Sequence, residues 1–176
     1  MTRLSVNVNK IATLRNARGG QQPDIIEAAV RIQEFGAHGI TVHPRPDARH
    51  ITFDDVRALR PVVYTEFNVE GYPSRAFLDL VLSVKPDQVT LVPDPPEALT
   101  SNAGWDTVRH AAFLQEAVLE LRQSGIRTSL FLETAPRLAD AAAAIGTDRI
   151  ELCTEPFAKG FPDPDALLPF VEAARY

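Results

Sequence analysis

The sequence has little of what marks several protein classes. It has one cysteine, Cys153, which excludes an internal disulfide and favours a reducing compartment. No apolar run approaches the ~20 residues of a membrane span, and the N-terminus lacks the apolar core of a signal peptide. The net charge of −5 argues against the basic field of a nucleic-acid binder. We therefore expect a cytoplasmic protein without nucleic-acid or membrane partners.

Further absences bear on the fold. No linker or low-complexity tract interrupts the 176 residues, which suggests a single domain over 1–176. No glycine-rich G-x-G-x-x-G motif follows the first strand-like run, as a dinucleotide-binding fold would require. No Cys/His cluster has the spacing of a structural zinc site, so we expect no metal.

What is present is one recurring pattern: a short β-branched run, a loop and a helical stretch. The predicted strands are 4–8, 39–43, 62–68, 88–92, 127–132 and 148–152. The predicted helices are 24–35, 53–59, 75–84, 108–123, 137–145 and 164–175. The helix boundaries rest on a capping box at Thr52 and Asp55, N-caps at Ser74 and Asp106, and glycines after helices at positions 36, 125 and 146.

Successive βα units indicate a parallel sheet, either doubly wound or closed into a (β/α)₈ barrel. Polar side chains at or near the predicted strand ends favour the barrel, which collects its active site there: Asn7, Asn9, His43, Glu70, Glu133 and Glu151. The predicted fold is thus an α/β TIM barrel of which this chain holds about six βα units. A complete barrel typically needs ~250 residues, so we expect a C-terminal truncation.

The segment Gly39-Ile-Thr-Val-His-Pro-Arg-Pro-Asp-Ala-Arg-His50 places two histidines and two arginines just after a strand. His43 at the strand end suits proton transfer near neutral pH. His50 either binds a phosphate or caps the next helix. Arg45 and Arg49, with Arg15 and Arg18 in the preceding loop, suggest a small anionic ligand. Surface solubility is the competing explanation for each arginine.

Carboxylates follow two other strands. Glu70 lies near His43 on the neighbouring strand, so the two either form an acid/base pair or Glu70 binds an arginine. Glu151 lies inside a strand-like run, where a charge needs a partner or a polar barrel mouth. Cys153 is expected to be a small core residue. The loop 93–106 is long enough to be a lid, with Thr100 among its polar residues.

Five segments together resemble the pyridoxine 5′-phosphate synthase family: NVNKIATLRNARGG, GITVHPRPDARHI, EFNVEGYPS, QVTLVPD and TSNAGWD. The resemblance runs from about Leu4 to the end of the chain. It implies a TIM barrel in a homo-octamer that needs neither organic cofactor nor metal. It implies condensation of 1-deoxy-D-xylulose 5-phosphate with 3-amino-2-oxopropyl phosphate to pyridoxine 5′-phosphate, phosphate and water.

The resemblance also assigns roles by motif. It implies acid/base catalysis by His43 and Glu70 and transition-state stabilisation by Glu151. It implies that Asn7 and Arg18 contact the amino-ketone phosphate. It implies that the deoxyxylulose phosphate is contacted by Arg45, His50 and Thr100. Asn9 and Lys10 stand where the family more often has Asp-His. Lysine can hold a phosphate but does not replace histidine in proton transfer, so we expect a variant subgroup.

Two other interpretations remain open at this point. A truncated barrel that lacks its last strands, and with them a further catalytic histidine and a phosphate site of the family, is either an enzyme fragment or an inactive phosphosugar-binding or assembly module. A Schiff-base aldolase would instead need a lysine at a strand end, and Lys10 is the nearest candidate.

Overall fold

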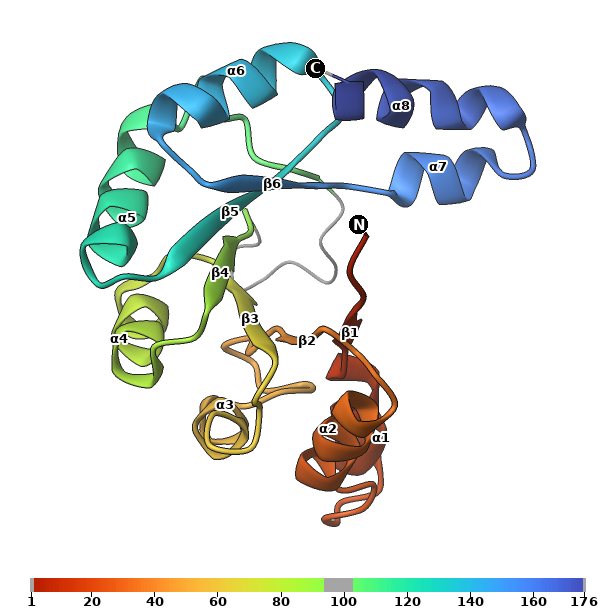
Figure 1. Cartoon of the computed structure of the whole chain (residues 1–176), viewed down its shortest axis with the longest axis vertical. Coiled ribbons are helices and arrows are strands. Elements are labelled where there is room, and N and C mark those ends of the chain that lie inside the picture. The colour runs from red at the N-terminus through yellow and green to blue at the C-terminus, as the bar shows by residue number, and fades with distance from the viewer. Residues whose placement is uncertain (1, 94–102, 176) are drawn as a thin grey trace. The chain divides into compact units, whose positions relative to one another are not determined.

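The structure is a computed structural model that describes residues 2–93 and 103–175 (Figure 1). Its strands are β1 (Ser5–Asn7), β2 (Gly39–Val42), β3 (Glu66–Gly71), β4 (Gln88–Leu91), β5 (Arg127–Leu132) and β6 (Arg149–Leu152). Its helices are α1 (Asn9–Ala17), α2 (Ile25–Glu34), α3 (Phe53–Leu59), α4 (Arg75–Val84), α5 (Ala111–Gln123), α6 (Pro136–Ile145), α7 (Glu155–Gly160), the 3₁₀ helix η1 (Pro164–Leu167) and α8 (Leu168–Arg175).

Neighbouring strands follow the order of the chain, β1-β2-β3-β4-β5-β6. A doubly wound sheet reverses its strand order at a switch point, whereas a (β/α)₈ barrel adds each strand beside the last. The prediction of an α/β fold with barrel-type connectivity is confirmed. The chain divides into two compact units, Met1–Val89 and Thr90–Tyr176.

In the first unit, β1, β2 and β3 form parallel ladders whose register brings polar residues together. Thr41 of β2 pairs with Asn7 of β1 on one side and with Asn68 of β3 on the other. The hydroxyls of Ser5 and Thr41 share a hydrogen bond of 2.8 Å, and Asn68 donates to Thr41 Oγ1 at 3.4 Å. Because side chains alternate along a strand, the intervening Ile40 lies on the other face, and it is fully buried.

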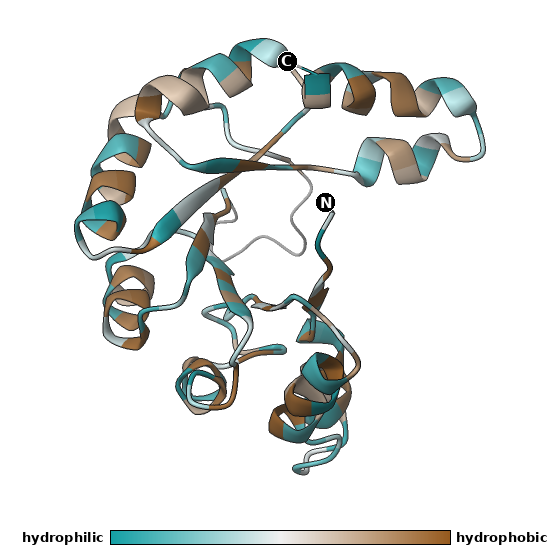
Figure 2. Ribbon diagram, viewed as in Figure 1, coloured by the Kyte–Doolittle hydropathy of each residue, from teal (hydrophilic) through white to brown (hydrophobic). Residues whose placement is uncertain are grey.

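Helices α2, α3 and α4 of the first unit begin at residues that cap them. Asp24 accepts hydrogen bonds from Ile26 N and Glu27 N, and the Thr52–Asp55 capping box is present. Ser74 caps α4, whose apolar stripe includes the buried Phe77, Leu78, Leu80 and Val81. Figure 2 shows both apolar and polar residues on this helix, and one-sided burial requires the apolar ones to gather on its inner face.

In the second unit, β5 and β6 pair in parallel, with Phe131 opposite Glu151. Helices α5 and α6 contact each other and β5, and their inward side chains Leu114, Leu121 and Leu138 are buried. Helices α7, η1 and α8 contain no buried residue. Phe157 contacts Phe161 and Phe170 edge-on at about 6 Å, which links these C-terminal helices to one another.

Five features of local structure differ from the sequence predictions. The predicted strand 62–68 begins only at Glu66, because Val62 N and Val63 N bond to Leu59 O and complete the last turn of α3. Asp106 caps a turn through Arg109 N, while α5 begins at Ala111. Helices α1 and α7 were not predicted, and η1 precedes α8 within the predicted helix 164–175.

Candidate functional site

Residue His43 follows β2 directly, and its neighbour across the ladder is Glu70 of β3. The β2–β3 ladder ends with Val42 opposite Val69, and one further step places His43 beside Glu70. His43 is 8% exposed and Glu70 is half-buried. The predicted proximity of these two residues thus follows from strand register within one unit.

Burial and its neighbours keep the His43 imidazole neutral. Burial is the largest cause that lowers the pKa of His43. Electrostatic interactions with His50 and Arg45 act in the same direction, and the pKa falls to about 3. Asp47 opposes the shift without outweighing it. The backbone N–H of His43 donates to Asn9 Oδ1 at 2.9 Å, which fixes the start of the loop. At neutral pH this imidazole can accept a proton.

The side chain of His50 lies close to that of His43. The two rings are 5.9 Å apart between centroids and inclined at 52°. Burial and then Arg45 lower the pKa of His50, with Arg49 and Lys10 adding to the effect and Asp47 opposing it. Its Nδ1 atom is buried and has no hydrogen-bond partner among residues 2–93 and 103–175. A ring nitrogen in this position is suited to a ligand.

A buried guanidinium provides the positive charge of this cluster. Arg45 is 5% exposed, and its Nε lies 3.8 Å from Asp47 Oδ1. Asp47 also accepts from Arg49, which is more exposed. One carboxylate therefore faces two arginines, and a net positive charge remains beside two neutral imidazoles.

Most residues of the N-terminal motif lie on α1, a helix that the sequence pattern did not predict. Asn7 ends β1 and its Oδ1 accepts from Asn9 N at 2.9 Å. Asn9 and Lys10 form the first turn of α1, and Lys10 is exposed. Arg18 is the exposed C-cap of the same helix, about 13 Å along its axis from Asn9. The structure therefore brings Asn9 to His43, while Asn7 contacts Asn9 and Arg18 is exposed at the other end of α1.

In the second unit, Glu151 lies on β6 in a half-buried position. Burial raises the pKa of Glu151, and a hydrogen bond with Thr90 opposes the rise. Burial also raises the pKa of the Cys153 thiol, a backbone hydrogen bond from Glu155 opposes the rise, and the negative charge of Glu133 adds to it. Cys153 packs with Val92 and Phe131 in the core, so the expectation of a core cysteine is confirmed.

The predicted lid falls largely outside the described residues, and Thr100 lies there. What is described is the segment's end. Gly104 N donates to Glu133 Oε1, Trp105 Nε1 donates to Leu91 O, and Trp105 N donates to Phe131 O. Trp105 is thus anchored against β4 and β5, at the point where the predicted lid segment ends.

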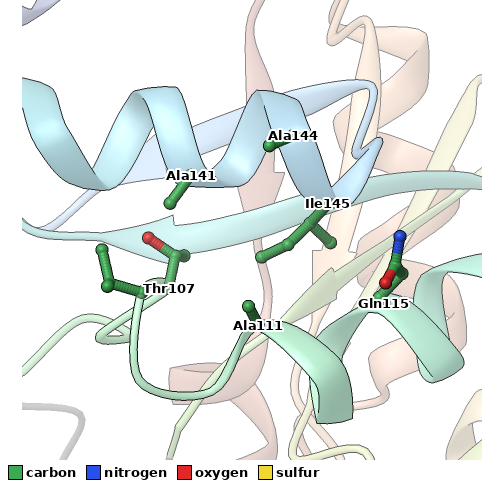
Figure 3. A pocket seen from close by; sticks show the side chains of 7 residues that line it. Thr107, Ala111, Gln115, Ala141, Ala144 and Ile145 are labelled. Atoms are coloured by element: carbon green, nitrogen blue, oxygen red, sulfur yellow. The ribbon is translucent and has the colours of Figure 1, made fainter.

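A separate pocket of about 350 Å³ lies between α5 and α6 (Figure 3). Its lining is mostly small and apolar, with Thr107 and Gln115 as its polar members. It contains no titratable side chain, so it offers no acid/base chemistry. Among the described residues no group of three or more His, Cys, Asp or Glu could hold a metal. No described helix combines the length and hydrophobicity needed to cross a membrane.

Sequence reasoning missed two residues that shape the cluster around His43, Asp47 and Asn16, and in the second unit it missed Glu133 as a loop anchor. Asp47 could have been found from the sequence, because an aspartate after a proline is typical of a turn in which its side chain bonds the backbone two residues on. Asn16 and Glu133 act on segments distant in the chain. No local pattern points to such contacts.

Comparison with known proteins gives one family. The model of the family described as "Pyridoxal phosphate biosynthesis protein PdxJ" matches residues 4–175. A protein of Phocaeicola vulgatus named pyridoxine 5′-phosphate synthase is 58% identical over 99% of this chain and 74% of its own length. A Christiangramia forsetii protein of the same name is 56% identical over 99% of this chain and 75% of its own length.

Solved structures support the fold. A mandelate oxidase mutant with (S)-mandelic acid superposes with a TM-score of 0.63 at 11% identity, over 96% of this chain and 61% of that chain. A flavocytochrome b2 variant with sulfite bound superposes with a TM-score of 0.62 at 12% identity. The superposition covers 98% of this chain and 47% of that chain. At such low identity these similarities concern the chain path and not the chemistry.

Proposed function

The chain belongs to the pyridoxal phosphate biosynthesis protein PdxJ family, and from that membership we propose that it acts as a pyridoxine 5′-phosphate synthase. The reaction would condense 1-deoxy-D-xylulose 5-phosphate with 3-amino-2-oxopropyl phosphate. It would release pyridoxine 5′-phosphate, inorganic phosphate and water. Imine formation, dehydration and ring closure consist mainly of proton transfers, so the enzyme needs acid/base groups and phosphate sites.

The observation that carries this proposal is the cluster of His43, Arg45 and His50 beside Glu70. A buried guanidinium with two neutral imidazoles favours a phosphorylated ligand, because a phosphate would satisfy both the charge and the hydrogen-bonding capacity of the cluster. We assign Arg45, His50 and Thr100 to the deoxyxylulose phosphate. Phosphate near Arg45 would also raise the pKa of His43 from about 3 toward neutrality.

The catalytic roles follow from this environment. His43 would accept and return protons, and Glu70 on the adjacent strand would act as its acid/base partner. A Glu151 carboxyl with a raised pKa can stay protonated longer than an ordinary glutamate, which suits stabilisation of developing negative charge.

The remaining polar residues are assigned to substrate binding. Asn7 and Arg18 would contact the amino-ketone phosphate, and Lys10 would add positive charge near His50. Asn9 would hold the His43 backbone while its amide nitrogen faces substrate. Arg18 would have to approach the ligand from the far end of α1. We also expect a cytoplasmic homo-oligomer, an octamer as in the family, that uses no organic cofactor or metal.

The test is turnover by the complete protein with both substrates together and with each alone. We expect phosphate release and pyridoxine 5′-phosphate fluorescence only with the pair. His43→Gln should abolish both signals while leaving the circular dichroism spectrum unchanged. Phosphate release with one substrate alone would contradict the proposal.

The second candidate is an inactive phosphosugar-binding or assembly module. The chain covers about three quarters of its relatives' length, and Arg149 and Ile150 of β6 are exposed. Calorimetric binding of 1-deoxy-D-xylulose 5-phosphate without any turnover would favour this module. Product formation by the chain alone would exclude it.

A further inference from the structure

The segment between β2 and α3, residues 43–52, is held at its far end by side chains of α1. This segment carries Arg45 and His50, the two residues assigned above to a phosphate. Its near end is fixed where Asn9 accepts from His43 N. The far end has no strand to support it, so its position depends on side-chain contacts.

The first of these contacts is an ion pair with two parallel hydrogen bonds. Arg15 Nη1 lies 2.6 Å from Asp55 Oδ1, and Arg15 Nη2 lies 2.9 Å from Asp55 Oδ2. Their side chains are only 17% and 16% exposed. Burial raises the pKa of Asp55, but the hydrogen bonds from Arg15 and Thr52 outweigh it and hold the pKa below its usual value. The pair is therefore charged at neutral pH.

The same carboxylate also begins α3. Asp55 Oδ2 accepts from Thr52 N at 2.8 Å, and Thr52 Oγ1 accepts from Asp55 N at 3.1 Å. Asp55 thus joins the N-terminus of α3 to α1 through one side chain. The residue just before Thr52 is the buried Ile51, so the segment has little freedom there.

The second contact reaches the backbone of the segment itself. Asn16 Nδ2 donates to His50 O at 2.8 Å and to Ala48 O at 3.2 Å, and Arg15 Nη2 lies 3.4 Å from His50 O. Ala48 has a φ of 52°, a left-handed backbone conformation that residues other than glycine rarely adopt. The surrounding contacts hold the backbone in it. The carbonyl of His50 is therefore held by α1, which restrains the backbone that carries the His50 ring.

We propose that Arg15, Asn16 and Asp55 form a clamp that positions Arg45 and His50 for phosphate binding. This inference rests on the proposed function and deepens it. Arg15 is a positioning residue, since its guanidinium is committed to Asp55. Of the two arginines in the segment Thr13-Leu-Arg-Asn-Ala-Arg18, only Arg18 is then left for substrate.

The test compares Arg15→Gln and Asn16→Ala with Arg57→Gln as the matched control. Arg57 forms an exposed ion pair with Asp54 on the same helix α3 and does not touch the segment. We expect the first two variants to weaken binding of 1-deoxy-D-xylulose 5-phosphate roughly tenfold, seen as a higher KM with a smaller change in kcat. Arg15→Lys should recover part of the loss.

A second readout does not depend on the reaction. In the NMR spectrum of the unliganded chain, the His50 imidazole signals should shift in Arg15→Gln and Asn16→Ala but not in Arg57→Gln. Unchanged His50 signals in the first two variants would overturn the clamp, as would unchanged KM for an active enzyme. If the unaltered chain neither binds nor turns over substrate, the proposed function fails, and the His50 signals alone decide the clamp. Should Arg15→Gln not fold, Asn16→Ala decides, because it removes only exposed hydrogen bonds, two to the segment and one from Arg15 Nε.

Discussion

Around His43, burial and neighbouring cations act on one imidazole in the same direction. The result is a histidine that stays neutral well below the pH at which an exposed one is protonated. His50, 5.9 Å away, is shifted the same way by burial and by Arg45. Two neutral rings beside a buried arginine make a site that gains a favourable interaction when an anion arrives.

This arrangement predicts a specific loss of stability in acid. The folded state holds the His43 pKa near 3, and the unfolded value is about 6.5, so the unfolded chain binds the proton more readily. Stability should fall as pH decreases from about 6.5 toward 3, with a slope approaching about 1.4 kcal/mol per pH unit from this group. Urea unfolding of the unaltered chain and of His43→Gln over this range measures it. Acidic groups contribute equally to both proteins, so the difference between them reports His43. Equal slopes of unfolding free energy against pH in the two proteins would contradict the assignment.

At the scale of elements, short helices and side-chain anchors do the positioning. Helix α1 supplies Asn9 to the end of β2, Arg15 to the first turn of α3 and Asn16 to the carbonyl of His50. The buried Gln33 of α2 accepts from Tyr64 N and Thr65 N and so fixes the chain before β3. In the second unit, Glu133 and the backbone of β5 anchor Gly104 and Trp105. Each functional loop is thus held by an element that is distant in sequence.

The anchor at Gly104 gives a prediction with a matched control. A Cβ at this position would lie 2.4 Å from Leu132 C and from Glu133 N, both backbone atoms that cannot move aside easily. We expect Gly104→Ala to destabilise the chain by about 2 kcal/mol. Gly20→Ala, where no atom lies within 4 Å of the added carbon, should change stability little. Thermal unfolding of both variants measures this, and equal midpoints would contradict the close approach.

For the whole molecule, burial differs between the regions of the chain. All four residues of β2 are buried, whereas β6 has two exposed and two half-buried residues. Helices α7 and α8 bury none of theirs. The chain also covers only about three quarters of its relatives' length. That residues 1–176 form one incomplete barrel domain stays a prediction, as does the octamer.

This difference predicts uneven protection against amide hydrogen exchange. Amides of β2 and β3 should exchange only through large opening events, while those of α8 should exchange through local fraying. We expect protection factors at least a hundredfold lower in α8 than in β2, on the order of the spread between fraying ends and a core. Exchange followed by NMR or mass spectrometry measures this. Comparable protection in the two elements would show that α8 is covered in solution.

The sequence by itself determined the class of fold, most element positions and the family. Helices α3 and α4 and strand β5 have the predicted bounds, because hydrophobic period and capping residues act locally. Helix α1 was missed, since a short helix with one buried residue carries no clear periodic signal. Only the tertiary structure decided that Asn9 and His43 meet, that Arg15 binds Asp55 while Arg18 stays exposed, and that His43 is neutral. These properties depend on burial and on contacts between residues some 30 to 40 positions apart, which no local pattern encodes.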